Sequence, residues 1–118
     1  MKKEKFHIIL ETNSIKDEYS VLGNYDNNMI EYYESNKLRS KIIIDLNDKT
    51  LVKDNIDYKI TLNLNNNKNG IIYLKKEEHE LELKLKIETF SFKNNKLIMI
   101  YNIIDSNELV KYEITIGG

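Results

Sequence analysis

The segment Glu80–Phe92 reads Glu-Leu-Glu-Leu-Lys-Leu-Lys-Ile-Glu-Thr-Phe-Ser-Phe and alternates charged and apolar residues over its first nine positions. Successive side chains of a β-strand point to opposite faces, so this alternation predicts a strand with one face on a core and the other in water. The same leucines on a helix would scatter around its axis and form no stripe. Beyond Glu88 the phase changes, because Phe90 and Phe92 occupy even positions. A β-bulge near Glu88-Thr89 would turn both sets inward.

Further strand-like segments flank this one, and short polar turns separate them. Turn signals include Lys16-Asp17-Glu18, Asp26-Asn27-Asn28 and the Asn-Gly pair that ends Asn65–Gly70, since Asn, Asp and Gly tolerate the backbone angles of tight turns. Gly23 lies within a strand pattern and indicates a bulge, a bend or a close backbone approach. The other predicted strands are Phe6–Ile15, Tyr19–Asp26, Met29–Glu34, Leu38–Leu46, Thr50–Lys53, Tyr58–Asn65, Ile71–Lys75, Leu97–Ile104 and Leu109–Ile116.

These segments predict an all-β protein, because none shows a helical period over the length of a typical helix. The connections are too short for parallel crossovers, which need about a dozen residues, so the strands are expected to pair antiparallel. Closure into a barrel would remove the exposed edges that isoleucine-rich strands otherwise leave open to aggregation. We therefore expect a single antiparallel β-barrel domain over residues 1–118, with about eight to ten strands.

Several short motifs occur in a characteristic order along the chain. They are Gly23-Asn24-Tyr25, Ile30-Glu31-Tyr32-Tyr33-Glu34, Tyr73, the Glu-Leu-rich strand from Glu80 into Thr89, and Glu113-Ile114-Thr115-Ile116. In this order they resemble the YwiB-like family of small bacterial proteins over nearly the full length. The resemblance implies a lipocalin-like, calycin-type β-barrel, and it carries no activity and no site. Lys53-Asp54-Asn55 departs from the family's Arg-x-Gly and His79 from a usual glycine, so no role of that arginine transfers.

Composition excludes several classes of function. The 118 residues carry 18 basic and 19 acidic side chains, a net charge of -1, which gives no basic surface for nucleic acid or an anionic membrane. The absence of cysteine excludes disulfides, thiolate metal sites and a cysteine nucleophile. Met1–Lys5 leads directly into a strand pattern without a signal-type apolar segment, and no apolar run approaches the roughly 18 residues of a membrane helix. We expect a soluble cytoplasmic protein.

No catalytic or metal-binding pattern stands out. Glu77-Glu78-His79-Glu80 could offer metal ligands, but consecutive strand residues point to opposite sides and the spacing matches no zinc pattern. His7 has no partner in the sequence pattern, although Asp17, Glu18 and several hydroxyl residues leave a triad open. We expect a protein that is not an enzyme and that needs neither metal nor cofactor.

The eight tyrosines are the more informative group. They are good strand formers whose hydroxyls reach water at a barrel rim, and this structural role is the favoured interpretation. As a ligand cage they would offer the mixture of apolar faces and hydroxyls that small-molecule pockets use. Three of them, Tyr25, Tyr32 and Tyr73, are the candidates for ligand binding at a barrel mouth. Base stacking on them would need a basic groove that the composition does not supply.

Two functions follow from how full the barrel is. The predicted inward side chains are bulky and the chain has no alanine, so a mostly filled barrel with at most a shallow mouth pocket is expected. This favours a non-enzymatic interaction scaffold; the alternative is a binding module for a small apolar or amphipathic ligand. Leu97–Ile104 is apolar in both phases and predicts a weak homodimer or a covering segment. The predicted inward positions are Leu10, Leu62, Leu64, Leu81, Leu83, Leu85, Ile114 and Ile116.

Overall fold

The computed structural model describes residues 3–35, 37–65 and 69–117, and the strands found there form one antiparallel sheet. Their order across the sheet is β8-β7-β6-β5-β4-β3-β2-β1-β11-β10-β9. The eleven strands are β1 (Lys3–Thr12), β2 (Lys16–Asp26), β3 (Met29–Tyr33), β4 (Lys41–Asp45), β5 (Thr50–Asp54), β6 (Tyr58–Asn63), β7 (Gly70–Leu74), β8 (His79–Leu83), β9 (Leu85–Lys93), β10 (Lys96–Ile103) and β11 (Glu108–Ile116).

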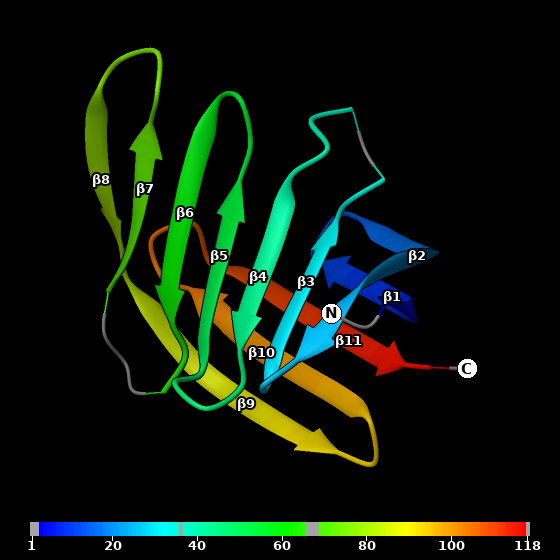
Figure 1. Cartoon of the computed structure of the whole chain (residues 1–118). Helices are drawn as coiled ribbons and strands as arrows, with labels where there is room; N and C mark the ends of the chain where they lie inside the picture. Colours follow the sequence, from blue (N-terminus) through cyan, green and yellow to red (C-terminus); the bar gives the residue numbers. More distant parts are fainter. Residues whose placement is uncertain (1–2, 36, 66–68, 118) are drawn as a thin grey trace.

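The sheet curls into a nearly closed barrel. Figure 1 shows β3 to β8 lying across a second layer that contains β9, β10, β11 and β1. The two edge strands, β8 and β9, are consecutive in the chain with only Lys84 between them. The ring is therefore completed by the chain itself, and the backbone carbonyl of Lys84 accepts a 2.9 Å hydrogen bond from the amide of Ile104 at this corner.

This corner explains why the prediction of eight to ten strands was too low. The segment predicted as one strand, Glu80–Phe92, forms two strands that pair with different neighbours, β8 with β7 and β9 with β10. The alternation of apolar and charged residues continues across Lys84, so nothing in the local pattern marks the point where the paired strand changes from β7 to β10. All-β architecture, antiparallel pairing and barrel curvature are confirmed.

The predicted bulge is confirmed at Glu88. Tyr101 of β10 pairs with Ile87, and the next residue, Ile100, pairs with Thr89, so Glu88 is an extra residue without a partner. Ile87 before the bulge and both phenylalanines after it pack against the core. The bulge thus reconciles two opposite phases of alternation within one strand.

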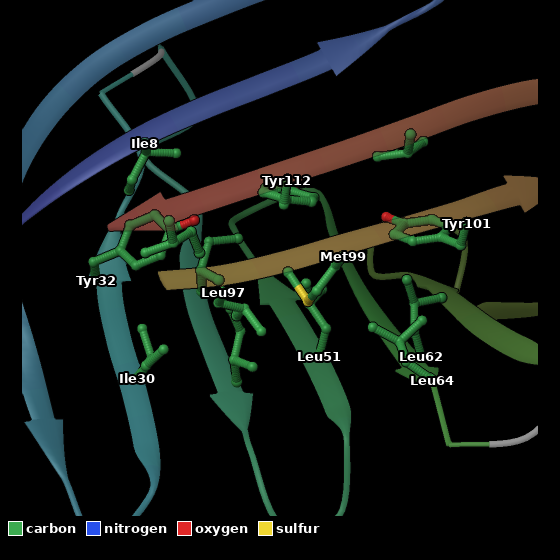
Figure 2. Close-up of a cluster of buried hydrophobic side chains, with 14 of the residues drawn as sticks. Ile8, Ile30, Tyr32, Leu51, Leu62, Leu64, Leu97, Met99, Tyr101 and Tyr112 are labelled. Atoms are coloured by element: carbon green, nitrogen blue, oxygen red, sulfur yellow. The ribbon is translucent and has the colours of Figure 1, made fainter. Parts of the chain in front are cut away.

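The core lies between the two layers of the barrel. Figure 2 shows Met99 of the second layer close to Leu51 of the first, and Leu97 close to Tyr32. Of the predicted inward residues, Leu62, Leu64, Leu85, Ile114 and Ile116 are buried, and Leu10 and Leu83 pack against the core from its margin. The prediction that Leu81 points into the core was wrong, since its side chain is 43% exposed. β8 lies at the edge of the sheet, where neighbouring strands cover this face only in part.

Two predicted turns have different outcomes. Asn27 and Asn28 both have positive φ, as the tight turn between β2 and β3 requires, so this prediction is confirmed. Lys16-Asp17-Glu18 is the start of β2 rather than a turn. The chain reverses just before it, where the amide of Thr12 donates to the carbonyl of Ile15 at 2.8 Å. Charged residues can occupy strand positions there because they lie at the exposed rim. The Asn65–Gly70 turn lies partly outside the described residues.

The apolar strand β10 lies inside the sheet, between β9 and β11. Leu97 and Met99 are fully buried, whereas Ile98 and Ile100 on the other face are half-buried. Ile104, just after the strand, is 52% exposed. The outward apolar surface of this segment is thus smaller than its sequence indicates. Within residues 3–35, 37–65 and 69–117, no helix is long and apolar enough to cross a membrane.

Candidate functional site: an open seam between two strands

The barrel wall is open between β2 and β3. β2 pairs with β1 from Lys16 to Asn24, but it pairs with β3 only over Asn24–Asp26. From Asp17 to Leu22, no described strand pairs with the side of β2 that faces β3. We call this opening the seam: one bank is Asp17–Leu22 of β2, and the other is Tyr33–Ser35 together with Arg39.

Gly23 stands where the two strands separate. A Cβ atom at this position would lie 2.5 Å from the carbonyl oxygen of Glu31 and 2.5 Å from the ring of Phe6. Only glycine allows the backbone of β3 to approach β2 so closely, which confirms that Gly23 marks a close backbone approach. The seam therefore starts at a fixed point of contact.

Two hollows follow the seam. One, of about 240 Å³, is lined by Asp17, Glu18 and Tyr19 from β2 and by Glu34 and Ser35 from the opposite bank. The other, of about 400 Å³, is lined by Val21, Leu22, Tyr33, Glu34, Ser35 and Arg39. Both hollows share Glu34 and Ser35, so together they form one opening along β2.

Glu34 is the central charged group of the seam. It is only 3% exposed, and its Oε1 lies 3.2 Å from Nζ of Lys53. A buried carboxylate is stable only when cations and hydrogen-bond donors compensate for its lost hydration. The pair therefore ties β5 to the end of β3.

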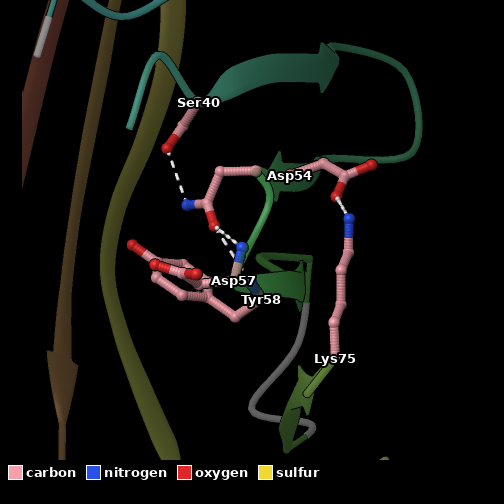
Figure 3. A network of polar contacts seen from close by, with 6 residues as sticks. Ser40, Asp54, Asp57, Tyr58 and Lys75 are labelled. Carbon is pink, nitrogen blue, oxygen red and sulfur yellow. Dashed lines mark hydrogen bonds and ion pairs between the residues drawn. The ribbon is translucent and has the colours of Figure 1, made fainter. Parts of the chain in front are cut away.

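The bank beyond β3 is held in place by a buried polar network. The amide of Glu34 donates to the carbonyl of Ser40 at 2.8 Å, and the Ser40 hydroxyl accepts a 2.9 Å hydrogen bond from the Asn55 side chain. Asn55 Oδ1 in turn accepts from the amides of Asp57 and Tyr58, each at 2.9 Å (Figure 3). This network fixes the loop between β3 and β4 to the turn between β5 and β6.

Two buried tyrosine hydroxyls lie behind the seam. Among the described residues, the hydroxyls of Tyr19 and Tyr32 interact with each other and with no other hydrogen-bonding group. Burial raises the pKa of the Tyr19 hydroxyl well above its usual value, and the negative charge of Glu34 acts in the same direction. Burial likewise raises the pKa of Tyr32, with Tyr19 and Glu34 contributing. Both hydroxyls are therefore neutral, and each can both donate and accept a hydrogen bond.

A smaller hollow of about 170 Å³ reaches into the barrel from the same end. Its walls are mainly apolar, and Leu10 lines both this hollow and the seam. The polar groups that line it include Lys53, Glu108 and the two core tyrosines Tyr101 and Tyr112. Burial raises the pKa of both tyrosines.

The three predicted ligand-binding tyrosines do not form one ring. Tyr32 is in the core, 1% exposed, with its ring edge-on to Phe6. Tyr25 packs against Phe92, with ring centroids 6.0 Å apart, near the turn between β2 and β3. Tyr73 is 38% exposed on the outer face of β7, opposite Lys59 and Glu80. Their role in ligand binding stays a prediction, and only Tyr32 lies beside the seam.

Of the groups considered for catalysis and metal binding, Asp17 and Glu18 line one seam hollow, and His7, His79 and Glu80 lie on open surfaces. His7 contacts Glu18 Oε2 through Nε2 at 2.7 Å and Ser20 Oγ through Nδ1 at 3.3 Å. These three residues lie on the outer face of β1 and β2, and neither His7 nor Ser20 lines the hollows described above. His79 and Glu80 lie at the start of the edge strand β8, exposed. In the described part of the chain, no group of three or more His, Asp or Glu is placed to hold a metal ion.

The arrangement at the seam suits recognition. It combines a length of unpaired strand edge with apolar side chains and the hydroxyl of Tyr19. One sequence signal pointed to it: Glu34 shares the inward phase of Ile30 and Tyr32, which places an acidic residue among core positions. The absence of a partner along β2 had no such signal. In comparisons with known proteins, no family model matches the chain, and neither does any curated protein or solved structure.

Proposed function

We propose that this protein is a non-enzymatic interaction scaffold, a largely filled barrel that presents its surface to a partner protein. The observation that carries the proposal is the packing of the core. Among the described residues, seventeen apolar side chains from both layers, none more than 6% exposed, fill the space between the layers. Side chains packed at interior density leave little void for a cargo molecule.

The alternative, a carrier that holds a small apolar or amphipathic ligand in the barrel, has weaker support. Pockets for such ligands usually measure about 300 to 1,000 Å³. The hollow that enters the barrel measures about 170 Å³, and core side chains such as Leu51, Leu62 and Tyr112 line it. The hollow of about 400 Å³ lies along the seam, where a partner can approach from outside.

The family resemblance is part of this proposal. A lipocalin-like member of the YwiB-like family in a bacterial cytoplasm is the setting we infer, and the antiparallel, nearly closed barrel supports it. A weak homodimer through Leu97–Ile104 is one form that the scaffold can take, and exposed Ile104 favours it. Sedimentation across a wide concentration range tests the dimer, which fails if the protein stays monomeric throughout.

In-cell photo-crosslinking tests the scaffold directly. A photoreactive amino acid replaces one exposed residue at a time, at Leu22 and Tyr33 beside the seam and at Ile56, Ile71 and Leu109 elsewhere. We expect at least one position to give a single dominant protein adduct in cells of the native host. Native mass spectrometry of the protein isolated from that host should show the same partner.

The carrier would replace the scaffold if no position gave a protein adduct and native mass spectrometry found a stoichiometric small molecule. Saturable binding of a fluorescent fatty acid provides a second check. Leu83 packs against the core, so Leu83→Trp would fill space inside the barrel. Loss of fatty-acid binding in this variant would favour a ligand in the interior.

A further inference from the structure

We propose that the seam binds an extended peptide segment of a partner protein, which adds a strand to the free edge of β2. This inference rests on the proposed scaffold function and names the kind of partner that it binds. The edge from Asp17 to Leu22 is six residues long, about 20 Å at the rise of an extended strand. A strand edge without a neighbour offers a row of backbone donors and acceptors, and another extended backbone is the ligand that matches them.

The side chains along the seam provide pockets for alternate residues of such a peptide. Successive residues of an added strand point to opposite faces of the sheet. Outward residues would lie between Leu22 and Tyr33, which are 66% and 51% exposed. Inward residues would reach Tyr19 and Val21, at the margin of the core.

Tyr19 adds a polar group to the seam. Its side chain lines one of the two hollows, and among the described residues its hydroxyl interacts only with that of Tyr32. A hydroxyl can donate one hydrogen bond and accept others, so a bound segment with a polar inward side chain would gain from pairing with Tyr19.

The edge of β8 is a poorer site for strand addition. Its outward residues Glu80 and Glu82 are charged and exposed, but so are Asp17 and Glu18 of β2, and the two edges therefore differ in what lies beside them. Glu82 also accepts a 2.7 Å hydrogen bond from Asn69, and none of the hollows described above lies along β8. In contrast, the two seam hollows lie along the free edge of β2.

The second bank favours a single peptide over a second copy of this chain. Tyr33–Ser35 and Arg39 face β2 across the hollows, and the Ser40–Asn55 hydrogen bond fixes their loop. The β2 edge of a second copy would bring its β1 with it, so it needs room for two strands where a peptide needs room for one. The two hollows, of about 240 and 400 Å³, are the space that a single added strand would occupy, and a preformed site lowers the entropic cost of binding.

A peptide library and hydrogen exchange test the inference. The probe is a synthetic library of acetylated, amidated octapeptides, screened against the intact protein and followed by titration of the best binder. We expect one-to-one binding that slows amide exchange selectively in Asp17–Leu22 of β2. The same peptide with N-methyl groups on alternate residues keeps its side chains but loses backbone donors, and we expect its affinity to fall at least about tenfold.

Matched variants separate the seam from the rest of the surface. Leu22→Asp places a charge beside the seam, and Ile56→Asp places one at a residue that is 81% exposed on the turn between β5 and β6. We expect the first variant to weaken binding at least about tenfold and the second to leave it unchanged, since both side chains are exposed and folding tolerates surface charges.

Several results would overturn the inference. They are failure of the library to yield a binder, protection that maps outside β2, equal binding of the N-methylated peptide, and a β2-mediated dimer in sedimentation. Crosslinked adducts only at Ile56, Ile71 or Leu109 would also refute the seam while leaving the scaffold function standing. A stoichiometric small molecule without protein adducts would refute both.

Discussion

Gly23→Ala is the substitution that most sharply tests how the seam is held at its closed end. The new methyl group would lie 2.5 Å from the Glu31 carbonyl oxygen and 2.5 Å from the ring of Phe6. Ordinary contact begins near 3.4 Å, so these atoms must move apart by roughly 0.9 Å. Phe6 is fully buried and Glu31 is held in the β2–β3 and β3–β4 ladders, so neither can move freely.

The expected cost follows from that geometry. Overpacking a tight site costs about 1 to 3 kcal/mol, and loss of a ladder hydrogen bond between β2 and β3 adds about 1 kcal/mol. We expect Gly23→Ala to lower the free energy of unfolding by about 3 kcal/mol. Gly70→Ala is the matched control, because its methyl group would meet the movable end of Leu62 at 2.5 Å and backbone only at 3.2 Å. It should cost about 1 kcal/mol or less.

Urea denaturation followed by circular dichroism measures both variants. With a slope of about 1.5 kcal/mol/M, Gly23→Ala should lower the midpoint by about 2 M and Gly70→Ala by less than about 1 M. Unchanged slopes would show that both effects act on the same two-state transition. If the two variants lose equal stability, or Gly70→Ala loses more, then the close approach at Gly23 does not hold β2 and β3 together.

Three further predictions concern the bulge, the buried ion pair and the buried tyrosines. Deleting Glu88 removes only the unpaired residue, whereas deleting Ser91 forces a phenylalanine outward. In urea denaturation, the Ser91 deletion should lower the free energy of unfolding by about 2 kcal/mol more than the Glu88 deletion. A larger loss from the Glu88 deletion would contradict the bulge. Lys53→Met removes the ion-pair partner of Glu34 and should cost about 3 kcal/mol, most of it recovered by adding Glu34→Gln; equal stabilities of the wild type and Lys53→Met would show that the pair contributes nothing. Burial raises the pKa of four tyrosine hydroxyls in the folded protein, so the same hydroxyls ionise at lower pH in the unfolded chain. The free energy of unfolding should therefore be constant up to about pH 10 and fall above it, and tyrosinate absorbance from these residues should appear only on unfolding. Ionisation of these hydroxyls near pH 10 in the folded protein would count against their burial. The tyrosines concerned are Tyr19, Tyr32, Tyr101 and Tyr112.

Local pattern was enough to predict most of the fold. Alternation in Glu80–Phe92 predicted a strand, and its change of phase predicted the bulge at Glu88, because both depend only on which way successive side chains point. It could not predict that Leu81 is exposed. The face of a side chain is a local property, but the cover over that face depends on neighbouring strands.

The candidate site was harder to predict from sequence. Gly23 and the inward phase of Glu34 are local signals, and both mark real features of the seam. The free edge of β2 has no such signal, since a strand alternates in the same way whether one or both of its sides are paired. Which tyrosines share one end of the barrel depends on strand order and register, so Tyr25 and Tyr73 could not be placed from their positions in the chain.

Native-state hydrogen exchange by NMR tests the central claim most directly, because the proposed scaffold works through a β2 edge that is unpaired in the free protein. Backbone amides of Asp17–Leu22 that point toward β1 take part in the β1–β2 ladder, whereas for those that point the other way no strand in the described part of the chain provides an acceptor. We expect alternating protection along this stretch, with every second amide exchanging close to the unprotected rate. In β11, which is paired on both sides, we expect all amides to be protected, whichever neighbouring strand they point toward. Uniform protection of Asp17–Leu22 in the free protein would contradict the open seam and the peptide site inferred from it.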